Sequence, residues 1–137
     1  MKLFRKKRKI SEIETLKMDP SAIKSPQTLD DFVLRGWSYH ARDMQDKAIE
    51  DFRRALELSP HNPDIHYALG LAYRAQGKTD EAVSAFKKVM EILLKDQDKE
   101  TDSARKEMLR RLALGHVNIL TTGDWGLERE VWKKLEL

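Results

Sequence analysis

Apolar residues recur at helical spacing along most of the chain, and turn signals divide this pattern into separate helices. The pattern predicts helices at about residues 29–42, 46–58, 63–76 and 80–94, then a longer one at 103–121 and a last one at 127–135. Thr28 begins a capping box before the first helix, and Asn62 precedes a proline in the first turn of the third. Gly77 supplies the left-handed stop that ends the third helix, and Thr79 caps the fourth.

The first 27 residues do not share this pattern. A capping-box sequence at residues 11–14 predicts a short helix at about 12–18. The Asp19-Pro20 and Ser25-Pro26 pairs are helix breakers, so residues 19–27 are expected to form a linker or an extended arm. We therefore expect a tail, short helix and linker at 1–27 and a helical domain at 28–137.

The helices at 29–62 and 63–96 form two lengths of sequence that align with each other at a spacing of 34 residues, with no insertion. A glycine, a tyrosine, an alanine and a phenylalanine recur at this spacing: Gly36, Tyr39, Ala48 and Phe52 in the first length, and Gly70, Tyr73, Ala82 and Phe86 in the second. Glycine has no Cβ, so it lets the two helices of a pair approach closely, and the phenylalanine fills the space between them. A fixed period of this length is typical of helical repeat proteins.

These residues resemble the tetratricopeptide repeat. The resemblance implies an all-α fold: an antiparallel helix-turn-helix array with two clear repeats at about 29–62 and 63–96, and a divergent helical pair at about 102–137. In the divergent pair Gly115 matches the glycine, but Asn118 stands where tyrosine would, and Trp132 and Leu135 are shifted by one residue from the phenylalanine and alanine positions. Repeats at the end of an array are often atypical, because one face meets water.

The resemblance also implies a concave groove, lined by the first helix of each pair, which binds an extended peptide or a helix of a partner protein. The residues expected to face it are Val33, Trp37, His40, Tyr67, Leu71, Arg74, Leu112, His116 and, less closely matched, Ile119. One subgroup of the family clamps the C-terminal carboxylate of chaperone tails with Lys and Asn, and Val33 and Trp37 stand at the matching places here. We therefore expect an apolar and aromatic groove that does not bind such tails.

Each groove residue also has a purely structural interpretation. Trp37 could instead pack between neighbouring helices, and Tyr67 and Leu71 could belong to the core between repeats. Arg74 could be a solvated helix residue. The sequence leaves these alternatives open.

Composition narrows the remaining classes of function. The chain has no cysteine, which excludes disulfides and thiolate chemistry, and it has no apolar run long enough to cross a bilayer. It contains no HExxH motif, no glycine-rich phosphate loop and no nucleophile elbow, and His61 and His66 are separated by a helix start. We predict a cytoplasmic protein that is not an enzyme, with no cofactor, no metal and no small-molecule substrate. Its predicted role is protein–protein interaction as an adaptor or scaffold.

Charge is concentrated in a basic tail. Residues 1–10 contain no acid and six basic residues: Lys2, Arg5, Lys6, Lys7, Arg8 and Lys9. Without these six, 20 of the 26 Lys and Arg remain against 23 Asp and Glu, so the rest of the chain has a formal charge of −3. Three interpretations of the tail stay open: a solubilising tail, a peripheral contact with anionic lipid, or a contact with nucleic acid that does not read its sequence.

Self-association is the alternative class of function. Apolar residues recur at helical spacing at Ile10, Ile13, Leu16 and Met18, so this segment could occupy the groove of its own chain or of a second copy. The helix expected at 127–135 could either cap the third helical pair or form a homo-oligomer contact.

Overall fold

The computed structural model describes residues 18–95 and 103–126, and all regular structure in these ranges is helical. In chain order the elements are a 3₁₀ turn, η1 (Pro20–Ala22), then α2 (Leu29–Ala41), α3 (Gln45–Leu58), α4 (Pro63–Ala75), α5 (Thr79–Lys95) and α6 (Ser103–Thr122). The all-α prediction is confirmed, and each α-helix begins and ends within one residue of its predicted bounds. Met18 lies outside any helix, while the rest of the predicted helix at 12–18 and the predicted helix at 127–135 fall outside the described residues.

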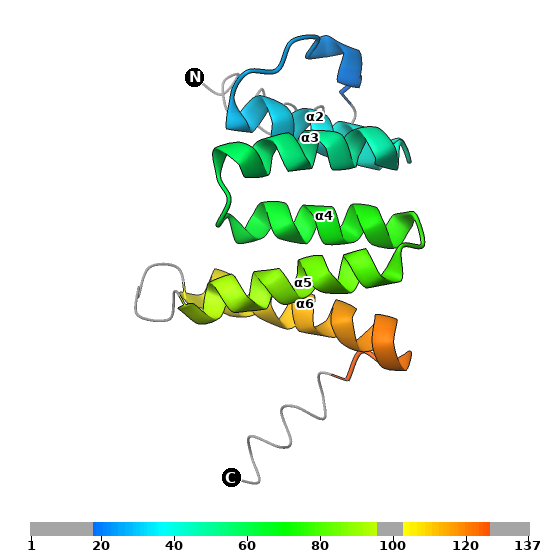
Figure 1. The fold of residues 1–137 in the computed structure, drawn as a ribbon, viewed down its shortest axis with the longest axis vertical. Helices are drawn as coiled ribbons and strands as arrows, with labels where there is room; N and C mark the ends of the chain where they lie inside the picture. Colours follow the sequence, from blue (N-terminus) through cyan, green and yellow to red (C-terminus); the bar gives the residue numbers. More distant parts are fainter. Residues whose placement is uncertain (1–17, 96–102, 127–137) are drawn as a thin grey trace, which may run out of the picture. The chain divides into compact units, whose positions relative to one another are not determined.

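The chain divides into two compact units, one ending at Pro60 and the other beginning at His61. The first unit is an antiparallel hairpin of α2 and α3 (Figure 1). Asp43, whose φ is 57°, makes the turn between the two helices. Thr28 and Asp31 form the predicted capping box at the start of α2, and these contacts lower the pKa of Asp31, chiefly through the N–H groups of Gln27 and Thr28.

The core of the first unit depends on the close approach of its helices. Ala48, Phe52 and Ala55 on α3 are fully buried. A Cβ on Gly36 would lie 2.6 Å from Cε1 of Phe52, so no side chain larger than hydrogen fits between α2 and this ring. The glycine at this position thus places the phenylalanine ring directly against the α2 backbone.

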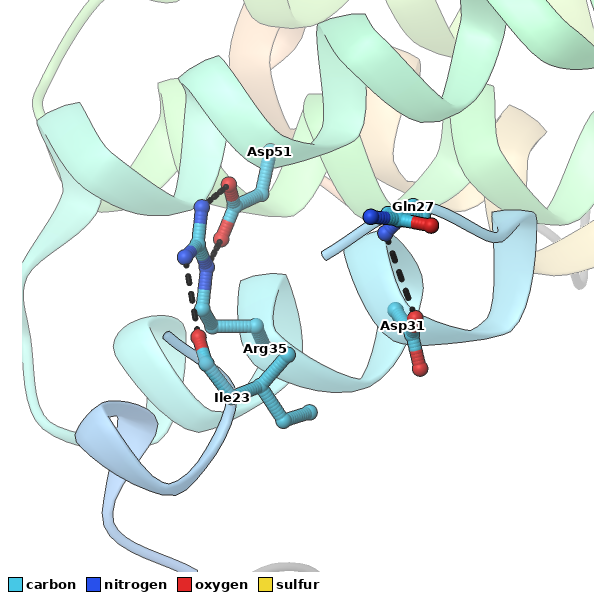
Figure 2. A network of polar contacts seen from close by, with 5 residues as sticks. All are labelled: Ile23, Gln27, Asp31, Arg35 and Asp51. Atoms are coloured by element: carbon cyan, nitrogen blue, oxygen red, sulfur yellow. Dashed lines mark hydrogen bonds and ion pairs between the residues drawn. The ribbon is translucent and has the colours of Figure 1, made fainter. Parts of the chain in front are cut away.

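An N-terminal arm, residues 18–27, lies against α2 of its own unit. Figure 2 shows the Arg35 side chain between the arm and α3: its Nε and Nη2 donate to Asp51 at 2.8 and 2.7 Å, and its Nη1 donates to the Ile23 carbonyl at 3.0 Å. The Ser38 hydroxyl donates to the Met18 carbonyl. Two polar side chains of α2 therefore hold the backbone of the segment predicted as a linker.

The second unit contains α4, α5 and α6, with α5 packed against both of the others (Figure 1). Asn62 caps α4 with Pro63 in the first turn, and Gly77, whose φ is 75°, ends the hairpin turn into α5, both as predicted. A Cβ on Gly70 would lie 2.6 Å from Cε1 of Phe86, which repeats the contact seen in the first unit. The buried core cluster draws on α5 and α6 and consists of Ala82, Phe86, Val89, Leu93, Ala113 and Val117.

The turn after α6 folds back onto that helix. A Cβ on Gly115 would lie 2.1 Å from Cε2 of Trp125, so the indole ring occupies the space that phenylalanine fills in the two preceding repeats. The Asn118 side chain donates to the Trp125 carbonyl at 2.9 Å, and Gly123 has a φ of 77°. An aromatic ring therefore reaches Gly115 from a turn, while the expected Trp132 and Leu135 lie outside the described residues.

Candidate functional site

The residues predicted to line the groove belong to both units. Val33, Trp37 and His40 lie on α2 of the first unit, whereas Tyr67, Leu71 and Arg74 lie on α4, and Leu112 and His116 lie on α6, of the second. A groove that runs across both units stays a prediction. Within each unit the contacts of these side chains are defined.

In the first unit Trp37 is half-buried and contacts its own repeat. Its ring meets Phe52 edge to face, with centroids 5.4 Å apart, and meets His40 at 5.6 Å. His40 Nδ1 lies 2.8 Å from Gln45 Oε1, and the Gln45 amide nitrogen donates to the His40 carbonyl. Trp37 is thus supported from within the first repeat and remains partly exposed, as does Val33 one turn before it.

In the second unit three of the predicted residues converge. The Tyr67 hydroxyl lies 3.0 Å from His116 Nε2, and Arg74 Nη1 lies 2.6 Å from His116 Nδ1. Tyr67 and Arg74 are two turns apart on α4, so one imidazole ring from α6 bridges them. The predicted faces of α4 and α6 are therefore neighbours within this unit.

The arginine fixes the direction of these hydrogen bonds. Arg74 can only donate, so His116 is not protonated at Nδ1 while this contact holds, and Nδ1 accepts. The neutral ring then carries its proton on Nε2, which donates to the Tyr67 oxygen. The Tyr67 hydroxyl proton is left to donate to a further acceptor.

Burial supports the same protonation state. His116 is 8% exposed and stacks on Phe86 with centroids 4.5 Å apart and an interplanar angle of 7°. Burial, together with the positive charge of Arg74, lowers the pKa of His116 to about 4. Burial also raises the pKa of Tyr67, while the Arg74 charge acts in the opposite direction. At neutral pH the cluster therefore consists of a neutral imidazole, a neutral phenol and one guanidinium.

Apolar side chains flank this cluster. Leu71 is half-buried against the core of the second unit, and Leu112 is half-buried on α6 one turn before His116. The Trp125 ring meets the His116 ring edge to face at 5.0 Å. The cluster is thus a polar site within a largely apolar and aromatic surface.

Several contacts are not among those the sequence indicated. Arg35 and Asp51 form a largely buried ion pair, and Ser38 holds the arm, although the helical pattern singled out none of the three. Trp125 was expected only within the terminal segment, and it is its place against Gly115 that brings it next to His116. The one available signal was the 34-residue register, which places Arg35 and Asp51 opposite the apolar Leu69 and Ala85.

Other classes of site were searched in the same ranges. Within residues 18–95 and 103–126, no group of three or more His, Asp or Glu side chains is placed to hold a metal ion. None of the helices in these ranges is both long and apolar enough to cross a membrane. The six basic residues of the tail lie outside the described residues.

Two family models match the chain. A model described as TPR repeat matches residues 36–77, and a model described as Tetratricopeptide repeat matches residues 65–100. The chain belongs to the tetratricopeptide-repeat family. The matched residues run from Gly36 on α2 past the end of α5, and proteins of this family generally mediate protein–protein interaction without being enzymes. No curated protein and no solved structure matches this tetratricopeptide-repeat chain.

Proposed function

We propose that this tetratricopeptide-repeat protein is an adaptor or scaffold that binds a peptide or helix of a partner protein through the first helices of its repeats. The observation that carries the proposal is the convergence of Tyr67, Arg74 and His116, which makes the predicted faces of α4 and α6 one continuous surface within the second unit. The proposal adds α2 of the first unit, with Val33 and Trp37, to the same binding surface.

The side chains on this surface are of the types that dominate protein interfaces. Tryptophan, tyrosine and arginine contribute most often to interface hot spots, and the surface contains Trp37, Tyr67 and Arg74. Trp37 and Tyr67 each contact a buried phenylalanine of their own repeat, so their rings lose little conformational freedom when a partner binds. A partner segment with apolar side chains would bury these rings further.

The test is a selection of short displayed peptides on the full chain, followed by affinity measurement. We expect selected peptides whose affinity falls about tenfold or more with Trp37→Ala. Leu58→Ala is the matched control, because Leu58 is an exposed apolar residue of α3, outside the proposed surface, and we expect less than about a twofold change there. Far-UV circular dichroism establishes that both variants keep their helices.

A second measurement locates the bound peptide without any substitution. Nuclear magnetic resonance spectra of the labelled chain should change at Leu71 and His116, and not at exposed positions of the second helices, such as Arg54 on α3 and Lys87 on α5. Changes confined to α3 and α5 would contradict the proposal.

A further inference from the structure

Arg74 differs from other arginines of the described chain in what it contacts. Arg35, Arg54, Arg105 and Arg110 each form an ion pair with a carboxylate. Arg74 instead donates to the neutral imidazole of His116, and within residues 18–95 and 103–126 no carboxylate forms an ion pair with it. Its charge therefore lacks the acidic partner that the other four have.

The surroundings of Arg74 hold the guanidinium in place without neutralising it. The side chain is half-buried in the last turn of α4, where the helix dipole favours a positive charge. One nitrogen is used by His116, which leaves the remaining N–H groups of the planar fork as donors. Such a fork suits a carboxylate, which can accept two parallel hydrogen bonds from it.

Tyr67 adds a second donor beside the first. Because His116 Nε2 donates to the Tyr67 oxygen, the hydroxyl proton points to another acceptor, and none is present among the described residues. The cluster therefore offers hydrogen-bond donors from two side chains and one uncompensated positive charge. It is complementary to an anionic acceptor.

We propose that Arg74, oriented by His116 and assisted by Tyr67, forms an ion pair with the side-chain carboxylate of an Asp or Glu within the partner segment. This inference rests on the proposed function and names the partner's chemistry. An acidic side chain inside the segment fits better than a chain terminus, because apolar residues lie on both sides of the cluster. Leu71 precedes Arg74 on α4 and Ile119 follows His116 on α6, so a bound segment can continue past the ion pair in both directions.

The experiment uses the full chain and displayed peptides whose two ends are chemically blocked, so that side chains supply the only carboxylates. We expect the selected peptides to share an Asp or Glu whose replacement by Asn or Gln lowers affinity about tenfold or more. Arg74→Gln should cause a similar loss with the acidic peptide. It should cause little loss with the amide peptide, because the two changes remove the same ion pair.

Two further variants make the result specific. Arg105→Gln is the matched control, since it removes the same charge from an exposed arginine of the same unit, and it should leave affinity within about twofold. Arg74→Lys keeps the charge but loses the planar fork, so an intermediate loss is expected. The change made on the peptide needs no change in the protein, so it decides the outcome even where Arg74→Gln impairs folding.

The outcomes separate this inference from the function on which it rests. Blocked peptides that bind equally well with acid or amide would overturn the ion pair and leave peptide binding intact. Binding that appears only when the peptide's C-terminus is free would assign the carboxylate to a terminus and overturn the internal position. Failure to select any peptide would overturn both proposals.

Discussion

The ion pair of Arg35 and Asp51 gives the sharpest prediction about stability. At a spacing of 34 residues, Arg35 corresponds to Leu69 and Asp51 corresponds to Ala85, and both residues of the second repeat are buried. The first repeat thus has a charged pair where the second has an apolar one. We predict that Arg35→Leu and Asp51→Ala are each strongly destabilising alone, and nearly neutral together.

The magnitudes follow from the exposure of the two side chains. Asp51 is 3% exposed and Arg35 is 19% exposed, with two hydrogen bonds of 2.7 and 2.8 Å between them. Removal of one member of a buried pair costs about 3–5 kcal/mol, because the other charge is left buried alone. We expect about 3 kcal/mol for Asp51→Ala, since water still reaches the guanidinium, and about 4 kcal/mol for Arg35→Leu.

The double variant should recover most of this loss. A buried ion pair can be replaced by apolar side chains at little cost, and the second repeat already has such a pair. The contact from Arg35 to the Ile23 carbonyl is still lost, which costs about 1 kcal/mol. We therefore expect the double variant to be about 1 kcal/mol less stable than the natural chain.

Urea denaturation of the four proteins in one buffer measures these differences. Urea is preferred to guanidinium chloride, because a salt would screen the interaction under test. The exposed pair Arg54 and Glu57 is the control, and its equivalent variants should change the free energy of unfolding by less than about 1 kcal/mol. A cost below about 1 kcal/mol for Asp51→Ala, or a double variant as unstable as the summed singles, would refute the reasoning.

Three further predictions concern the second unit, each read from urea denaturation. Gly70→Ala should cost about 2 kcal/mol, because the new Cβ would lie 2.6 Å from the buried Phe86 ring. Gly77→Ala should cost about 1 kcal/mol for a different reason: nothing lies within 4 Å, but its φ of 75° strains any L-residue. His116 should make stability depend on pH. Its pKa is lowered to about 4, so the unfolded chain takes up the proton first. Stability is therefore fully present above about pH 6.5 and is lost, by roughly 2 kcal/mol, as pH falls toward 4.

Each of these has its own contrary result. A Gly70→Ala chain as stable as the natural one would show that the Phe86 ring can move aside. A stabilised Gly77→Ala chain would show that the left-handed turn is not kept. For the pH dependence, His116→Gln should flatten the curve between about pH 6.5 and 4, whereas His61→Gln, at an exposed position, should not. Equal curves for these two variants would remove His116 as the cause.

The helices were predictable because their ends depend on local chemistry. The capping box at Thr28, the Asn62 cap before Pro63 and the left-handed Gly77 each act within a few residues, and the structure shows all of them where the sequence placed them. The ion pair of Arg35 and Asp51 joins residues 16 apart on two helices, and the helical pattern gave no reason to pair them. Local signals thus predicted the elements, and the register comparison alone pointed to the departure.

The site was predictable as a list of positions and not as a set of contacts. The repeat register placed Tyr67, Arg74 and His116 on the first helices of their pairs, yet no spacing rule says that one imidazole bridges the other two. That bridge depends on how α6 packs, which involves Trp125. The ring reaches Gly115 through a turn of the chain, so its place could not be read from a helical period.

The same comparison explains why the arm and the first repeat depend on each other. The residues of α4 that correspond to Arg35 and Ser38 are Leu69 and Ala72, which are buried and need no hydrogen-bond partner. Arg35 and Ser38 do need acceptors, and the carbonyls of Ile23 and Met18 supply them. Without these side chains the arm would lose the donors that hold its backbone, and without the arm the donors of α2 would lose acceptors. The polar departures from the repeat pattern are therefore the means by which residues 18–27 become part of the first unit.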